Sequence, residues 1–500
     1  MIEQPVNTRK ALLVAFAMGV LYVVALAYPV HRHIVGAFSD FYVRFAPDAD
    51  RVAAGEFPRN TYNPPGYPAL LALASPLTGD HFTTGKWMSL LAGGLTGALA
   101  FVLFRRLFDP GPALLAVPII LTSAVFATYA IAAMTDVPFV LLCLIVMIAI
   151  TSEGPHRLRA VILSGVLCGI AYLIRYNAVF LLVPGLAAAL WGERRWSSRA
   201  TLGAAYLASF LVTIAPWLWM NYTHHGSPFY STNYEDVARA FGITRSTPFT
   251  SLADVLLHDP ARFARRYVAN LGYTFFQTLG AGLALLPVGP LAAIGMGLSL
   301  ARNRRRPVFL VLLAALSFLL VMSLTHWERR YFFFILVCYS GFAAFAVFEI
   351  ARWVGRALGS MMAAQATIAV LVLWIVVPSI VTVWQAAAKT LSRQPVELLP
   401  AAEVVRREAA PRATVMAVRA QMAYLSRREW RPLPGADSVE GLKALLQQDP
   451  PGYVVYDRWA RKYMPELKSL LDPAASPRWL HAVYSHPGIV VYRVEMGQAK

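Results

Sequence analysis

Apolar residues along this chain gather into long runs, and short polar segments separate one run from the next. The runs are about 15–25 residues long, close to the length that a helix needs to cross a hydrocarbon core of about 30 Å. Backbone groups inside lipid must be satisfied within the segment, so the runs predict helices. About eleven membrane spans are expected, at residues 11–30, 84–104, 111–131, 137–151, 160–174, 178–191, 201–220, 268–300, 308–324, 332–350 and 364–386.

Basic residues gather in every second polar segment. If the N-terminus is cytoplasmic, all six segments on that side are basic, as the positive-inside rule requires. They contain Arg9, Lys10, Arg105, Arg106, Arg157, Arg159, Arg194, Arg195, Arg199, Arg302 to Arg306, Arg352 and Arg356. We therefore predict a multi-pass protein of the cell (inner) membrane, with the N-terminus cytoplasmic and the C-terminal domain extracytoplasmic.

The first apolar run has an alternative interpretation. Arg9 and Lys10, an apolar stretch and Ala25-Leu26-Ala27 also fit a cleavable signal peptide. The run is longer than such peptides, so we favour a retained first helix. The later topology is the same in both cases.

The composition supports the membrane interpretation. The chain is 57% hydrophobic and only 14% charged, whereas soluble domains carry about 25% charged residues. The net charge of +18 follows from the basic cytoplasmic segments, so nucleic acid is not expected as a partner. The three cysteines all lie inside apolar runs, which excludes a disulfide framework or a zinc spacing.

Two domains are expected. Residues 1–390 form an all-α polytopic membrane domain with two long outer loops, at 31–83 and 221–267. Residues 391–500 have the composition of a small soluble α/β domain outside the membrane. In that domain we find no nucleotide-binding glycine loop, catalytic triad or metal-ligand spacing, so a covering or acceptor-facing role is expected.

Local patterns place further elements. In the small domain, strands are predicted at Thr414–Val418, at Tyr453–Tyr456 and as a pair over 479–494, with helices at Ser438–Gln448 and Pro465–Leu471. Ser438 is expected to cap its helix. The segment Leu252–Ala269 is expected to lie as an amphipathic helix on the membrane surface.

Two acids next to spans are candidates for chemistry, because a carboxylate near hydrocarbon is costly. Asp40 follows the first span and has Tyr42 and Arg44 beside it. Asp136 separates two apolar runs, and its alternative role is to cap the helix that starts at Val137.

The Asp48-Ala49-Asp50 triplet can hold a divalent ion through two carboxylates. This pattern is short and therefore a weak signal, and no other cofactor is expected.

Three arginines lie on the expected outer side, where the positive-inside rule predicts none. They are Arg175, in a minimal turn, and Arg329 and Arg330, just before a span. A guanidinium binds phosphate bidentately and stays charged when it is partly desolvated. The group could therefore clamp a lipid phosphate. The alternative is structural pairing with Asp40, Asp136 or Glu328.

Several motifs of the membrane region occur in a characteristic order. They are Ser39-Asp40-Phe41-Tyr42, the Pro-Pro loop Tyr62-Asn63-Pro64-Pro65-Gly66-Tyr67-Pro68, Met134-Thr135-Asp136, Ile174-Arg175-Tyr176, Pro216-Trp217 and Glu328-Arg329-Arg330-Tyr331. This order resembles the class C (GT-C) glycosyltransferases that use polyprenyl-phosphate sugars. That superfamily includes the protein O-mannosyltransferases and the lipid A aminoarabinose transferases.

The resemblance implies an inverting transfer of a sugar from a polyprenyl-phosphate donor to the hydroxyl of a glycan, lipid or protein acceptor at the outer face. It implies that Asp40 is the general base and that Asp136 supports it. Donor phosphate binding falls to Arg175, Arg329, Arg330 and Tyr331, and substrate binding to Tyr42, Tyr62, Asn63 and Tyr67.

Two departures leave the sugar and the acceptor open. Asn63 stands where the aminoarabinose transferases have lysine, and Phe41 stands where the O-mannosyltransferases have glutamate. The alternative functions are a lipid-linked glycan transporter or flippase without transfer chemistry, and a glycan ligase.

Overall fold

The computed structural model describes residues 8–27, 29–36, 38–152, 157–191, 195–280, 282–283, 287–302 and 305–496. Of the basic segments, Arg194 and residues 303–304 lie outside this set. The chain divides into two compact units. The first consists of the chain up to His33 and Asp48–Leu391, and the second of Ile34–Pro47 and the chain from Ser392 onward.

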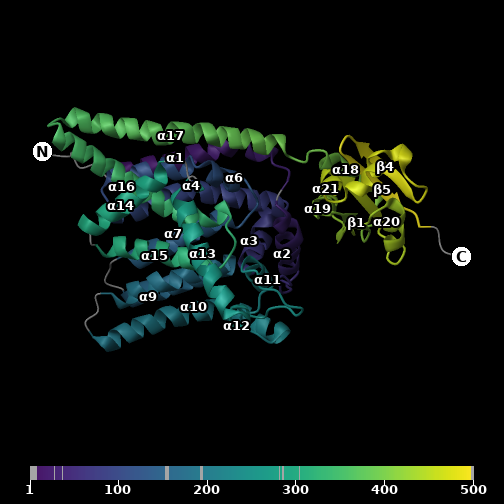
Figure 1. Ribbon diagram of the computed structural model, residues 1–500, viewed down its shortest axis with the longest axis horizontal. Coiled ribbons are helices and arrows are strands. Elements are labelled where there is room, and N and C mark those ends of the chain that lie inside the picture. Colours follow the sequence, from purple (N-terminus) through teal and green to yellow (C-terminus); the bar gives the residue numbers. More distant parts are fainter. Residues whose placement is uncertain are drawn as a thin grey trace. The chain divides into compact units, whose positions relative to one another are not determined.

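The first unit is helical (Figure 1). Its helices are α1 (Thr8–Ala27), η1 (His31–His33), α2 (Ala46–Ala53), α3 (Gly66–Ala74), η3 (Ser75–Leu77), α4 (His81–Leu107), α5 (Pro110–Leu121), α6 (Ala124–Ala130), α7 (Asp136–Thr151), α8 (Arg157–Ile174), η4 (Tyr176–Leu181), α9 (Leu182–Leu190), α10 (Trp196–His225), α11 (Asn233–Ala240), α12 (Leu252–His258), α13 (Pro260–Leu279), α14 (Val288–Arg302), α15 (Arg306–Met322), η5 (Arg329–Phe332), α16 (Phe333–Ala357) and α17 (Met361–Ser392).

The structure confirms a multi-pass helical membrane protein. Within the described residues, six helices are long and apolar enough to cross a membrane, and the bent pair α5–α6 makes a seventh. Shorter apolar helices lie at the positions of most other expected spans. The count of eleven spans stays a prediction.

Two expected elements are divided in the structure. The run expected as one span at 268–300 is split, because α13 ends at Leu279 before Gly280 and α14 begins after Pro287. The expected surface helix at Leu252–Ala269 is also interrupted, because Asp259 caps a new helix whose first residue is Pro260. Proline has no backbone N–H to donate, so it is favoured at a first helical position.

Glycines allow the closest helix contacts in the first unit. A Cβ built on Gly19 of α1 would lie 2.5 Å from the Gly94 carbonyl oxygen of α4. A Cβ on Gly165 of α8 would lie 2.5 Å from the Tyr206 carbonyl oxygen of α10. Small residues of this kind let helix backbones approach each other in lipid. They bring α1 close to α4, and α8 close to α10.

The second unit contains a five-stranded sheet in the order β2-β1-β3-β5-β4. Its strands are β1 (Thr414–Ala417), β2 (Glu429–Pro432), β3 (Tyr453–Asp457), β4 (Leu480–His486) and β5 (Ile489–Val494). β1 is parallel to β2 and β3, whereas β5 is antiparallel to β3 and β4. The small α/β domain is therefore present, with strands at all the predicted positions, the pair included, and β2 as an additional strand.

Helices cover both faces of this sheet. α18 (Leu398–Glu408) and α19 (Gln421–Ser426) pack on one face, through a core that includes Val415 and Val455. α20 (Val439–Leu446), α21 (Arg458–Tyr463) and η6 (Pro465–Leu471) pack on the other. Ser438 caps α20 as predicted, accepting a hydrogen bond from the Gly441 N–H at 3.0 Å. The helix expected at Pro465–Leu471 is the 3-10 helix η6.

The segment Ile34–Pro47 belongs to the second unit although it is distant in sequence. Gln394 Oε1 accepts hydrogen bonds from the backbone N–H groups of Val35 and Gly36, both at 3.0 Å. The segment contains η2 (Phe41–Phe45), a π-helix whose Phe41 ring meets the Tyr424 ring of α19 edge to face.

Candidate active site

Asp136 and Arg175 form a buried ion pair in the first unit. Arg175 Nη1 donates to Asp136 Oδ1 at 2.6 Å and to Thr135 Oγ1 at 3.1 Å. The Asp136 side chain is 1% exposed and that of Arg175 18% exposed. Asp136 is the first residue of α7 and makes no capping bond, so the capping interpretation was wrong. Its side chain turns to the neighbouring guanidinium instead.

Arg330 and Tyr331 of η5 extend this pair into a cluster. The Tyr331 ring lies 5.1 Å from the Arg175 guanidinium carbon and 5.2 Å from that of Arg330. Arg330 also pairs with Glu328 at 2.9 Å, and Asp136 is close enough to act electrostatically on Arg330 and Tyr331. We call Asp136, Arg175, Arg330 and Tyr331 the Asp136 cluster.

One oxygen of the cluster is left for a ligand. Asp136 Oδ2 is buried and has no hydrogen-bond partner within the described part of the chain. A buried acceptor of this kind costs about 1–3 kcal/mol when it is not satisfied. A hydroxyl donated by a bound molecule would satisfy it. Arg329, the fourth expected phosphate ligand, is exposed on η5.

The Pro-Pro loop is fixed by bonds to several helices. The Thr61 carbonyl accepts hydrogen bonds from the Tyr176 hydroxyl at 3.2 Å and from Ser231 Oγ at 2.7 Å. Trp217 Nε1 donates to the same Tyr176 hydroxyl at 3.2 Å. A Cβ on Gly66 would lie 2.5 Å from the Leu173 carbonyl oxygen, so only glycine fits where the loop enters α3.

The three expected substrate residues of this loop differ in their surroundings. The Tyr62 hydroxyl donates to Asp236 Oδ2 of α11 at 2.5 Å. Tyr67 is fully buried, its hydroxyl lies against Gly85 of α4, and it is within electrostatic reach of Asp136. Asn63 Oδ1 is buried and has no hydrogen-bond partner among the described residues. Tyr67 therefore lies beside the cluster, and Asn63 retains an unsatisfied acceptor.

Asp40 and Tyr42 lie in the second unit. Asp40 precedes η2, its side chain is 31% exposed, and Arg44 Nη1 lies 3.3 Å from its Oδ1. Tyr42 is 4% exposed, and its ring packs 5.2 Å from that of Tyr424. That Asp136 supports Asp40 at one site stays a prediction.

The two aspartates of the expected metal triplet have separate partners. Asp48 is buried in α2 and accepts from the backbone N–H groups of Arg59 and Asn60, at 3.0 and 3.3 Å. Burial raises the pKa of Asp48, and these hydrogen bonds oppose that rise. Asp50 is 73% exposed and pairs with His81 at 2.9 Å. Residues two apart on a helix point to different faces, which works against a shared ion.

Comparisons with known proteins concern both the family and the fold. Residues 62–219 match the family model described as dolichyl-phosphate-mannose-protein mannosyltransferase. No curated protein matches. Among solved structures, the oligosaccharyltransferase AglB of Archaeoglobus fulgidus, in complex with an inhibitory peptide and a dolichol-phosphate, is 13% identical with a TM-score of 0.60. That match covers 91% of this chain and 70% of AglB.

Two further structures extend the comparison. ArnT of Cupriavidus metallidurans bound to undecaprenyl phosphate is 14% identical with a TM-score of 0.58, over 96% of this chain and 97% of ArnT. The arabinofuranosyltransferase AftD from Mycobacteria is 13% identical with a TM-score of 0.52, over 98% of this chain and 40% of AftD. AglB, ArnT and AftD are GT-C glycosyltransferases.

The chain has the GT-C fold.

The family match locates part of the candidate site on this GT-C fold. Residues 62–219 include five expected site residues, namely Tyr62, Asn63, Tyr67, Asp136 and Arg175. Asp40, Tyr42 and the three η5 residues fall outside it. The matched segment thus contains the Pro-Pro loop and the buried ion pair, and η5 adds Arg330 and Tyr331 from a distant part of the GT-C chain.

Lys86 is a buried cation that sequence reasoning missed. It lies in α4, 7% exposed, and its Nζ donates to the His31 carbonyl at 3.3 Å. The ammonium also lies 4.9 Å from the Phe82 ring centroid, and the ring of the next residue, Trp87, lies 4.6 Å from that of His31 in a tilted arrangement. A lysine inside an apolar run was the available signal, since a charge there is costly.

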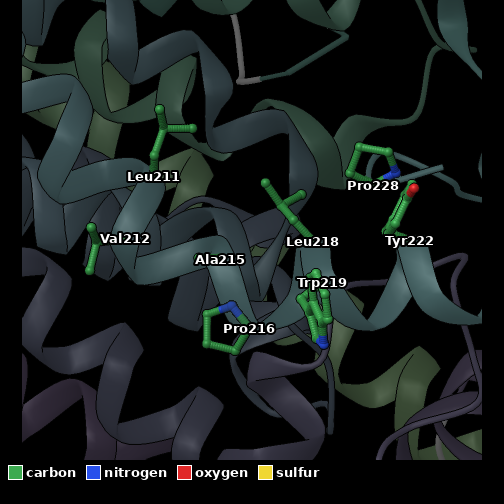
Figure 2. Close-up of a pocket in the computed structure, with 8 residues that line it drawn as sticks. All are labelled: Leu211, Val212, Ala215, Pro216, Leu218, Trp219, Tyr222 and Pro228. Carbon is green, nitrogen blue, oxygen red and sulfur yellow. The ribbon is translucent and has the colours of Figure 1, made fainter.

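An apolar groove of about 670 Å³ lies along α10 of the GT-C fold, and Figure 2 shows the residues that line it. Its lining residues come from α10 and the turn after it, and are Leu211, Val212, Ala215, Pro216, Leu218, Trp219, Tyr222 and Pro228. Val212 is 73% exposed and Trp219 68% exposed, as expected of a helix face in lipid. No acid or base lines the groove, so it carries no group for transfer chemistry.

Proposed function

We propose that this chain is a membrane glycosyltransferase that moves a sugar from a polyprenyl-phosphate donor to an acceptor hydroxyl at the outer face of the membrane. The observation that carries the proposal is the Asp136 cluster, in which one tyrosine ring lies beside two guanidinium groups next to a buried carboxylate. Support comes from the GT-C fold and from relatives described as bound to dolichol-phosphate or undecaprenyl phosphate.

Binding of the donor phosphate is assigned to Arg175, Arg330 and Tyr331, together with Arg329, which is exposed on η5. Polyprenyl phosphate is already a competent leaving group, so the site needs cations to stabilise the charge that develops on it. Arg175 uses Nη1 for Asp136 and Thr135, which fixes the plane of its guanidinium. A guanidinium held in this way loses little conformational freedom when phosphate binds.

The general base is assigned to Asp40. The acceptor oxygen attacks the anomeric carbon, the bond from that carbon to the phosphate oxygen breaks, and the acceptor proton passes to the Asp40 carboxylate. A single displacement inverts the anomeric centre, as in inverting glycosidases with the acceptor hydroxyl in place of water. Exposure supports this choice, since the Asp40 side chain is 31% exposed and that of Asp136 only 1%.

Asp136 supports the site by holding Arg175, and its Oδ2 can accept a sugar hydroxyl. Substrate contacts are assigned to Tyr42, Tyr62, Asn63 and Tyr67, among which Asn63 Oδ1 offers a buried acceptor. The acceptor is a glycan, lipid or protein hydroxyl. Divalent metal dependence through Asp48 and Asp50 is tested by chelation.

The deciding experiment is turnover by the purified protein in lipid, with a panel of polyprenyl-phosphate sugars and release of polyprenyl phosphate as the signal. Wild type is compared with Asp40→Asn and Arg330→Ala, with and without chelator. The matched control is Glu56→Gln, an acid of the same loop whose side chain is 55% exposed, which should keep wild-type turnover.

The outcomes separate the alternatives. Release that disappears in Asp40→Asn but not in Glu56→Gln supports the transferase and its base. If no donor is consumed while the lipid crosses the bilayer, the protein is a flippase. If only whole lipid-linked glycans are consumed, it is a ligase.

A further inference from the structure

In the sheet of the second unit, the connections that leave the neighbouring parallel strands β1 and β3 run in opposite directions along the sheet. From β1, the chain passes through α19 to β2 on one side, and β3 then lies on the other side of β1. The helices that follow the two strands cover opposite faces, with α19 on one and α21 on the other. In open α/β sheets, ligands bind outside the carboxyl ends of parallel strands at such a reversal.

The residues at this position are cationic and aromatic. Arg419 follows β1, and Arg458 and Trp459 follow β3. The Arg419 guanidinium carbon lies 3.3 Å from the centre of the Trp459 ring. The Tyr463 ring of α21 stacks with Trp459 at 6.3 Å, and Lys462 lies 5.1 Å from the Tyr463 centroid. We call these five residues the switch-point edge.

Asp457, the acid at the end of β3, already has hydrogen-bond partners. Asp457 Oδ1 accepts hydrogen bonds from the backbone N–H groups of Trp459 and Ala460, both at 2.9 Å. Arg458 has its own partners, since its Nη2 donates to the Arg393 carbonyl at 3.0 Å and its Nε lies 3.8 Å from Glu397. Arg419 stacks on the Trp459 ring and its guanidinium also interacts with the Tyr463 hydroxyl, and burial lowers its pKa. An oxyanion would compensate this partly desolvated cation.

We propose that the switch-point edge binds an oxyanion carried by a sugar, a phosphate or a carboxylate. Arg419 is the principal ligand, because a guanidinium held flat on a ring keeps its fork of N–H donors in place for either anion. Tyr463 is 57% exposed and offers an aromatic face to the sugar ring. The alternative source of the same chemistry is free phosphate.

The location also assigns the sugar a role, and this part rests on the proposed transfer function. α19 follows Arg419 directly, and its Gln421 and Tyr424 contact Val35 and the Phe41 ring of the segment that carries Asp40. The switch-point edge and the proposed base are thus attached to the same short helix. The bound sugar is then an acidic acceptor rather than the donor.

The test is calorimetric binding to the full-length protein in detergent. The probes are glucose 6-phosphate, glucuronate, neutral glucose and inorganic phosphate. Arg419→Gln should weaken binding of the two acidic sugars by about tenfold to a hundredfold, the effect expected of a charge-assisted hydrogen bond. Arg419→Lys should bind with intermediate affinity, because it keeps the charge and loses the fork.

Two variants serve as controls. Arg412→Gln removes the same charge from an exposed residue that precedes β1, at the end of the strand opposite to Arg419. This variant should bind acidic sugars like wild type. Arg330→Ala alters the proposed donor site, and acidic sugars should still bind. Equal binding of neutral glucose, an equal loss in Arg412→Gln, or a loss only in Arg330→Ala would each overturn the proposal. Binding of inorganic phosphate as tight as that of the acidic sugars would overturn the assignment to a sugar and identify free phosphate as the ligand.

Turnover separates the two proposals. With a donor that is consumed, Arg419→Gln should raise the KM for an acidic acceptor and leave the donor KM unchanged. If Arg419→Gln loses binding of acidic sugars but keeps the wild-type KM for the acceptor, only the assignment of the bound sugar as the acceptor is overturned. Absence of any turnover would count against the transferase, while the calorimetric result would still decide whether the edge binds an oxyanion.

Discussion

The two oxygens of the Asp136 carboxylate have different surroundings. Oδ1 is paired with Arg175 at 2.6 Å, whereas Oδ2 is buried without a partner in the described chain. The side chain can therefore act in two ways, because one oxygen orients the Arg175 guanidinium and the other can accept a hydrogen bond from a ligand. Asp136 could be recognised as a candidate from the sequence because it interrupts an apolar region, but its partner Arg175 could be identified only from the folded chain.

Asp136→Asn should lower the thermal unfolding midpoint and reduce turnover by at least a hundredfold. The change leaves the Arg175 charge buried without its counter-ion, and breaking a buried pair costs about 3–5 kcal/mol. Differential scanning fluorimetry and donor turnover measure the two effects. The double variant Asp136→Asn/Arg175→Gln should regain part of the stability and none of the activity. Wild-type turnover in Asp136→Asn would contradict its place in the site.

Tyr331 tests whether the aromatic ring matters more than its hydroxyl. Tyr331→Phe keeps a ring beside the two guanidiniums and should retain most of the donor affinity. Tyr331→Leu removes both cation–π contacts, each worth about 0.5–2 kcal/mol, and should raise the donor KM about tenfold or more. Equal KM values for the two variants would show that the ring does not position Arg175 and Arg330.

At the scale of elements, the hydropathy pattern predicts where helices lie better than it predicts where a helix is interrupted. The apolar runs correspond to α1, α4 and α16, because length and composition alone decide whether a segment suits lipid. The split at Gly280 and Pro287 inside a continuous apolar run was missed, since lipid tolerates either arrangement. The Pro-Pro loop was recognised as a motif, but its bonds to Tyr176 and Ser231 depend on tertiary packing.

Gly66→Ala should disturb this loop through the contact of α3 with α8. The added Cβ would lie 2.5 Å from the Leu173 carbonyl oxygen, which is backbone and cannot rotate away. Turnover and the unfolding midpoint should both fall. The matched control is Gly297→Ala in α14, where a Cβ meets nothing within 4 Å and alanine favours the helix by up to about 1 kcal/mol. A loss in both variants would show that the contact is not the cause.

At the scale of the whole molecule, the boundary of the second unit was the least predictable feature. A change in composition near residue 390 indicates where the small domain begins. Nothing in the composition of Ile34–Pro47 indicates that it packs with that domain through Gln394 and Tyr424. The expected base Asp40 is thus carried by the small domain, an arrangement that only long-range contacts reveal.

The orientation of the chain in the membrane can be tested with single cysteines, because the three native cysteines are buried and should not react. Gly435→Cys places a thiol at an exposed position of the second unit, where a Cβ meets nothing within 4 Å. Ser197→Cys places one at an exposed position between Arg195 and Arg199, in a segment that the positive-inside rule assigns to the cytoplasm.

A membrane-impermeant maleimide added to intact cells, with the outer membrane opened where one is present, should label Gly435→Cys at once. It should label Ser197→Cys only after the cell membrane is permeabilised. The reverse pattern would place the Asp136 cluster on the cytoplasmic side. Transfer at the outer face would then be excluded.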